Sequence, residues 1–251
     1  MAKIYLFFAV LTISWMTVVI SGLRRGEDAV KVEFPPSTST SFPRMVMVPS
    51  LPRLLEFTLC LRLKIESSAN VENFIISYAI GSGSDSNEIL LTANMNAPVN
   101  ITLRVVNNLA VLQCPGLTRG VWHDVCVTWS SATGRVELVV DEGFCSNQVN
   151  GIATGMSVRA GGVLVVGQEQ DTLGGGFDST QNLVGDITQL MLWNEVLTSS
   201  QIFRVGSCLN KECKSLPCCA EKENTGNVIN WLQTKFEYYD GAKTSSTQIC
   251  K

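Results

Sequence analysis

The stretch Phe57–Ile65, FTLCLRLKI, decides the fold, because apolar and polar residues alternate along it with the period of a half-buried β-strand. Other short runs share this alternation and are rich in Val, Ile, Thr and Phe; they cover residues 88–93, 101–106, 124–129, 135–141 and 162–168. Turn-forming groups rich in Gly, Ser and Asn separate the runs. The pattern therefore predicts an all-β fold, an antiparallel jelly-roll sandwich.

Three segments depart from this rhythm. Residues 27–53 are rich in Pro, Ser and Thr, which favours an extended arm with edge strands over a helix. Residues 197–203 predict one short helix, because Thr198 can cap its first turn. Residues 208–226 contain Cys, Lys and Glu without periodicity and are expected to form a crosslinked surface loop. The length of 251 residues suits a single all-β domain.

The beginning of the chain indicates export. One Lys precedes an apolar run from Ile4 to Ile20, and the small residues Ser21 and Gly22 follow it. This is typical of a cleaved signal peptide over residues 1–22, leaving 23–251 as the secreted, extracellular domain. A membrane anchor is the alternative, since the run approaches the length that spans a bilayer. No membrane insertion is expected after cleavage, and a net charge of -3 provides no basic surface for nucleic acid.

The cysteines agree with an exported chain. There are nine, which favours disulfides formed in an oxidising compartment, and the odd number leaves at least one thiol free or available for an intermolecular bond. Zinc spacing is absent from the sequence, because no CxxC pair or nearby His accompanies the adjacent Cys218 and Cys219. Asn100-Ile101-Thr102 is a sequon for glycosylation.

The stretch most informative about function is residues 167–181, GQEQDTLGGGFDSTQ. It combines three carboxylates, several amides and a glycine-rich turn, and such oxygen donors are the ligands that calcium prefers. A second oxygen-rich loop, residues 84–88, can contribute from a distant part of the sequence. The alternative is that both are ordinary solvated turns.

The order of these residues resembles the pentraxin family. The features that carry the resemblance are GQEQD at 167–171, GGxFD at 174–178, Gln181 and the following VGD, CVTWSS at 126–131, FTLC at 57–60, LWN at 192–194 and GNVINW at 226–231. They extend over roughly residues 27–251. The resemblance is to the short pentraxins, with a calcium loop similar to that of the neuronal pentraxins, and it implies a lectin or laminin-G-like sandwich.

The resemblance also implies a site with two calcium ions. Its ligands are Asn87, Glu169, the backbone oxygen of Gln170, Asp171, Asp178 and Gln181. Glu169 and Asp171 are expected to bridge both ions. Where many members have an acidic residue before the Asn87 equivalent, this chain has Ser86, with Asp85 one place earlier, so these two are further candidates.

Two other departures concern the ligand and the single histidine. Phosphocholine-binding members use an aromatic residue and a nearby carboxylate to hold the choline cation, whereas this chain has Thr92 at the aromatic position and no Asp or Glu over residues 92–120. Weak or absent phosphocholine binding is therefore expected. The family signature has a His where this chain has Asp124, so His123, one position away, is interpreted as structural.

For the cysteines, the resemblance implies the disulfide Cys60–Cys126 and suggests Cys208–Cys250. Proximity in sequence suggests Cys114 with Cys145, and Cys213 with Cys218 or Cys219.

The function that the resemblance implies is calcium-dependent pattern recognition, as in innate immunity, by a non-enzymatic lectin. It would bind phosphate-bearing or carbohydrate ligands and assemble as a homo-oligomer, a pentamer by the family name. A disulfide-linked structural glycoprotein of an extracellular coat or matrix is the alternative. A glycosidase is disfavoured, because Leu173 occupies the position where the paired-carboxylate motif would require another acid.

Overall fold

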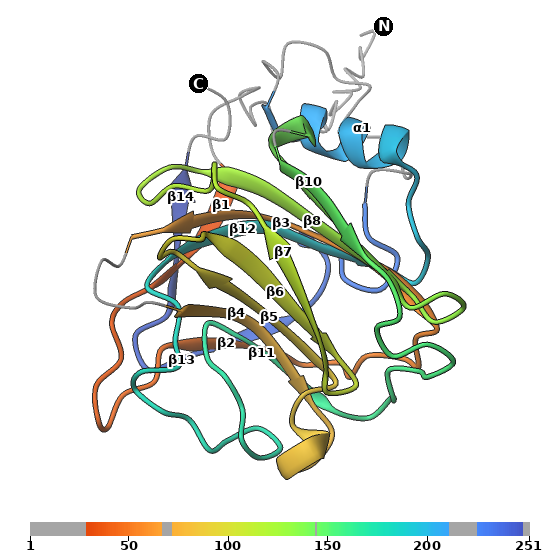
Figure 1. The fold of residues 1–251 in the computed structure, drawn as a ribbon. Coiled ribbons are helices and arrows are strands. Elements are labelled where there is room, and N and C mark those ends of the chain that lie inside the picture. Colours follow the sequence, from red (N-terminus) through yellow and green to blue (C-terminus); the bar gives the residue numbers. More distant parts are fainter. Residues whose placement is uncertain (1–28, 67–71, 144, 211–224, 248–251) are drawn as a thin grey trace, which may run out of the picture.

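The computed structural model describes residues 29–66, 72–143, 145–210 and 225–247. Two seven-stranded antiparallel sheets are present (Figure 1). In spatial order, the first contains β10 (Cys145–Val149), β9 (Arg135–Val140), β8 (His123–Ser130), β3 (Glu56–Ile65), β12 (Gly185–Trp193), β1 (Ala29–Phe34) and β14 (Lys243–Thr247). The second contains β13 (Phe236–Tyr239), β2 (Arg44–Met47), β11 (Val163–Val166), β4 (Glu72–Ala79), β5 (Ile89–Asn94), β6 (Asn100–Val105) and β7 (Asn108–Gln113). This confirms the predicted all-β sandwich.

The core lies between the sheets because alternate side chains of each strand point inward. In β3, Leu59, Leu61 and Leu63 join the main core, with Trp129 of β8 beside them, and all are buried. The outer face of the same strand carries Cys60, which pairs with Cys126. The alternation read in residues 57–65 thus assigns one set of residues to the core and leaves the other on the outer face.

One α-helix is present among the described residues, α1 (Ser199–Asn210), and it covers part of the outer face of the first sheet (Figure 1). Its Ile202 and Val205 pack against the Cys60–Cys126 disulfide. The backbone N–H of Gln201 donates to Thr198 Oγ1, and the Gln201 side chain accepts from the Thr198 N–H at 2.8 Å. This reciprocal arrangement is a capping box, so the predicted cap is present, although the helix is longer than predicted.

The N-terminal arm was predicted to supply edge strands, and this is wrong. Strand β1 lies between β12 and β14, and β2 lies between β11 and β13. The outer partners come from the C-terminal segment, whose strands β13 and β14 carry exposed side chains and no strong sequence period. Pairing with them satisfies backbone groups that an edge strand would leave open.

Several expectations fall outside the described residues. The signal peptide over 1–22, the cysteines at 213, 218, 219 and 250, and therefore the Cys208–Cys250 pairing all belong to this group. Within the ranges that the structure describes, two disulfides are present, Cys60–Cys126 and Cys114–Cys145. No helix among these residues is long and apolar enough to cross a membrane.

Candidate functional site

In the loop that follows β11, the glutamine side chains are hydrogen-bonded in the protein interior, and the carboxylates point the other way. Gln168 donates to Ser37 Oγ at 2.8 Å, and Gln170 donates to the backbone oxygens of Ser77 at 2.9 Å and Val163 at 3.1 Å. Both glutamines are fully buried. Because side chains alternate along an extended segment, Glu169 and Asp171 project to the opposite side.

The glycine-rich part of the loop folds back onto Asp171. The Gln170 side-chain oxygen accepts from the Gly174 N–H at 2.8 Å, and Thr172 and Gly175 exchange backbone hydrogen bonds. Gly176 has a φ of +74°, and a Cβ there would lie 2.8 Å from Asp171 Cβ. Only glycine meets both conditions, so Gly176 allows the turn to pack closely against Asp171.

Glu169 is a buried acid. The residue is 4% exposed, and its Oε2 has no hydrogen-bond partner among the described residues. Burial, with a smaller contribution from the charge of Asp171, raises the pKa of the Glu169 carboxyl to about 7. Asp171 is exposed beside it, so a bound cation would offset both the burial of the Glu169 charge and its repulsion with Asp171.

Asn87 supplies the matching group from the segment before β5. Its Oδ1 is also buried and has no partner within the described ranges. Its backbone oxygen accepts from the Asn107 N–H at 2.8 Å, and the next residue, Glu88, is held by the backbone N–H and guanidinium of Arg159. Glu88 is fully buried, so its ion pair with Arg159 anchors the segment that contains Asn87 to the rest of the protein.

Asp85 and Ser86, the further candidate ligands, are engaged elsewhere. The short 3-10 helix η1 (Gly83–Asp85) brings the Asp85 carboxylate 2.8 Å from the Arg159 guanidinium. The Ser86 hydroxyl donates to the Gly83 backbone oxygen at 2.7 Å.

Four predicted ligands line one cleft of about 580 Å³ on the outer face of the second sheet: Asn87, Glu169, Asp171 and Gln181. We call it the acidic cleft. The loop and η1 lie at the end of the molecule opposite α1 (Figure 1). Gln170 has its side chain in the interior, as expected of a residue that contributes only a backbone oxygen.

Asp178 is exposed and does not line the acidic cleft. Its Oδ1 accepts from the Thr180 N–H and hydroxyl, both at 2.8 Å, which lowers the pKa of this carboxyl. Its backbone oxygen accepts from the Gln181 N–H at 3.0 Å. Asp178 thus sets the turn that leads to Gln181, while its own carboxylate is held at the rim.

The donor set fits calcium better than a transition metal. Carboxylate and amide oxygens meet in the acidic cleft, and calcium takes such hard ligands in flexible geometry. Within the described residues, no group of three or more His, Cys, Asp or Glu side chains is close enough to hold a metal. A calcium site here therefore requires amide, backbone or ligand oxygens besides Glu169 and Asp171.

The acidic cleft also contains residues that the sequence analysis missed. Glu72 of β4 and Arg104 and Thr102 of β6 line it, next to Thr92, which the sequence analysis had considered. The absence of acids over residues 92–120 suggested a cleft without a further carboxylate, but β4 lies beside β5 and brings Glu72 to Thr92, 2.6 Å apart. Because side chains alternate along a strand, Thr102 and Arg104 were predictable as residues on the same face of one strand.

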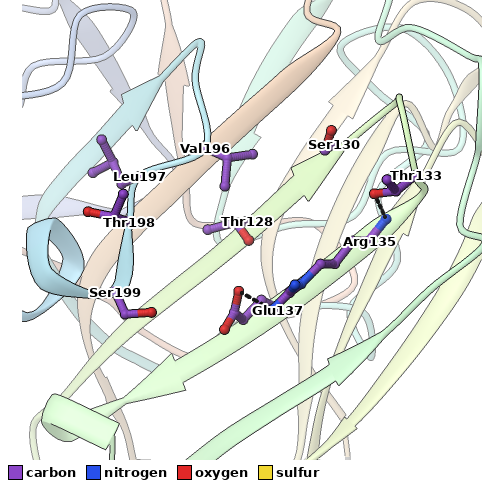
Figure 2. A pocket seen from close by; sticks show the side chains of 9 residues that line it. All are labelled: Thr128, Ser130, Thr133, Arg135, Glu137, Val196, Leu197, Thr198 and Ser199. Carbon is purple, nitrogen blue, oxygen red and sulfur yellow. Dashed lines mark hydrogen bonds and ion pairs between the residues drawn. The ribbon is translucent and has the colours of Figure 1, made fainter.

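A second cleft, of about 360 Å³, lies on the outer face of the first sheet (Figure 2). We call it the hydroxyl cleft, after Thr128, Ser130, Thr133, Thr198 and Ser199, which line it. Its charged side chains, Arg135 and Glu137, pair with each other at 3.2 Å. The charges of the hydroxyl cleft are therefore neutralised within the protein.

Two other predicted residues have structural surroundings. His123 is buried, with Nδ1 2.6 Å from Asp141 and Nε2 near Thr118. Asn100 begins β6, is 8% exposed, and donates from its amide to the Pro98 backbone oxygen at 2.8 Å.

The fold is a lectin-like β-sandwich, and its acidic cleft is lined by carboxylate, amide and hydroxyl oxygens. The family model described as "Pentaxin family" matches residues 31–246, so the chain belongs to the pentraxin family. It is 38% identical to C-reactive protein 1.4 of Limulus polyphemus, over 92% of this chain and 90% of that protein. It is 32% identical to human neuronal pentraxin-1, over 92% of this chain and 50% of that protein.

A solved structure agrees with this assignment. The native heptameric SAP-like pentraxin from Limulus polyphemus superimposes with a TM-score of 0.77 and 28% identity, over 88% of this chain and 97% of that one.

Proposed function

We propose that this chain is a secreted, calcium-dependent pattern-recognition lectin and not an enzyme. The observation that carries the proposal is the pair of buried, unpartnered oxygens, Asn87 Oδ1 and Glu169 Oε2, at one end of the acidic cleft. A buried polar atom without a partner is costly, and a bound cation would remove that cost.

We propose that each subunit binds two calcium ions, as the resemblance to pentraxin calcium loops implies. The ligands are the side chains of Asn87, Glu169, Asp171 and Gln181, the backbone oxygen of Gln170, and Asp178 at the rim. Bound calcium would offer open coordination positions to a phosphate or sugar oxygen. The protein contributes a fixed frame, since the Gln168 and Gln170 anchors and the Glu88–Arg159 pair hold the two ligand segments before any ion binds.

We propose that the chain assembles as a homo-oligomer, because several weak binding sites on one face of the assembly would together give a higher avidity. The Limulus relative is heptameric, whereas the family name suggests a pentamer. Analytical ultracentrifugation of the secreted protein measures the ring size, and a mass near one subunit would contradict the assembly.

Calcium titration by calorimetry tests the central proposal. We expect two ions per wild-type chain, a loss of calcium affinity of about 100-fold or more in Glu169→Gln, and an unchanged titration for Glu137→Gln in the hydroxyl cleft. Phosphoethanolamine and glycan supports should retain the wild type, and a chelator should release it. Absence of calcium binding by a folded wild-type protein would overturn the lectin proposal.

A further inference from the structure

The acidic cleft extends as a groove along β5 and β6, and strand register gives the order of its side chains. At one end, the Asn107 N–H contacts the Asn87 backbone oxygen. Next, Arg104 stands opposite Leu90, and then Thr102 stands opposite Thr92. Arg104 is three residues from Asn107, and three residues span at most about 10 Å, so the Arg104 backbone lies within that distance of this end.

Arg104 is the cationic side chain of this groove. It is half-buried, and its cross-strand neighbours are the apolar Leu90 and Leu109. Across the described ranges, no hydrogen bond or ion pair joins the Arg104 side chain to another residue; its backbone pairs within the sheet. By contrast, Arg44, Arg135 and Arg159 each pair with a carboxylate.

Beyond Arg104, the groove offers oxygens. Thr92 Oγ1 lies 2.6 Å from Glu72 Oε1 and 2.6 Å from Thr102 Oγ1. The Thr92 hydroxyl donates to the carboxylate, so Glu72 retains acceptor capacity on its other oxygen. Such a group suits the hydroxyl donors of a sugar.

We propose that the acidic cleft binds an acidic glycan with two anionic groups, of which one binds at the Asn87–Glu169 end and the second, a sulfate or carboxylate, pairs with the Arg104 guanidinium. This inference rests on the proposed calcium-dependent function. A guanidinium binds planar or tetrahedral oxyanions bidentately, and flanking apolar residues strengthen the pair by excluding water. Sugar hydroxyls then donate to Glu72.

The same arrangement disfavours a choline head group. With its phosphate at the Asn87–Glu169 end, the short spacer of phosphocholine would place the quaternary ammonium next to Arg104, where like charges repel. Glu72, the carboxylate that could attract this cation, lies further along the groove, two residues before Phe74, which pairs with Thr92.

Calorimetry on the full secreted chain in saturating calcium tests the inference. The probes are a disaccharide with two sulfate groups, its monosulfated counterpart, and phosphocholine. The variants are Arg104→Gln, Arg104→Lys and the matched control Arg135→Gln. We expect the wild type to prefer the disulfated probe by about tenfold or more, Arg104→Gln to lose this preference, and Arg104→Lys to keep part of it.

Calcium affinity and melting temperature separate the outcomes. If Arg104→Gln keeps wild-type calcium affinity and stability but loses the preference for two sulfates, the inference holds. If calcium-dependent binding occurs with equal affinity for both disaccharides, or is unchanged in Arg104→Gln, the inference fails while the lectin proposal stands. If the wild type binds no calcium, the lectin proposal fails and the inference with it.

Discussion

The hydroxyl cleft and the acidic cleft lie on the outer faces of opposite sheets, and they differ in whether their charged side chains are paired. In the hydroxyl cleft, Arg135 and Glu137 neutralise each other on one strand (Figure 2). In the acidic cleft, Glu169 is beside a second carboxylate and has an unpartnered oxygen. The difference favours the acidic cleft as the candidate binding site, because its charge is unbalanced and partly desolvated.

The largest expected effect comes from the ion pair beneath the acidic cleft. Arg159→Met leaves the Glu88 carboxylate buried without a cation, so unfolding free energy should fall by about 3 kcal/mol, the lower end for a buried pair because Arg159 is half-exposed. Denaturant unfolding measures this, and calcium affinity should fall with it. The double variant Glu88→Gln/Arg159→Met should recover part of the stability; no loss in the single variant would show that the pair is not an anchor.

Calcium itself should stabilise the folded chain. At a free concentration of 100 times Kd, one site adds about 2.7 kcal/mol, which corresponds to a rise in melting temperature of about 5–10 °C for a domain of this size. Glu169→Gln should abolish this rise, whereas Glu137→Gln should keep it. An equal rise in both variants would place the calcium site outside the acidic cleft.

A smaller effect is expected from Asp178, which lies at the rim. If its carboxylate turns inward to bind the second calcium ion, Asp178→Asn should reduce the stoichiometry from two ions to one at micromolar calcium and leave the tighter site intact. Calorimetric titration counts the ions. A variant that still binds two with wild-type affinity would limit the role of Asp178 to its turn with Thr180.

The smallest effect should come from the exposed pair in the hydroxyl cleft. Arg135 and Glu137 are partly exposed, so Arg135→Gln should change the unfolding free energy by less than about 1 kcal/mol. Comparison with Arg159→Met in the same denaturant series gives the contrast between an exposed and a buried pair. Equal losses would mean that burial does not distinguish them.

The sequence predicted the strands with strong alternation and missed those without it. Strands β3 and β8 lie where their alternation predicts, because one face of each packs in the main core. Their outer faces are largely buried as well, with Cys60 and Cys126 packed against α1. Strands β13 and β14 carry mostly exposed side chains, so no periodicity signals them. Their pairing with β2 and β1 comes from the tertiary structure, which is why the arm was wrongly expected at an edge.

By itself, the sequence determined the sandwich class, the family, and the oxygen-rich loop, since local alternation and an ordered motif are properties of neighbouring residues. Only the tertiary structure decided which residues share the acidic cleft. It brought Asn87 to Glu169, turned Asp85 toward Arg159, and supplied Glu72 and Arg104 from separate strands. The physical reason is that strand pairing joins segments far apart in the chain, and the register that sets their neighbours depends on the whole sheet.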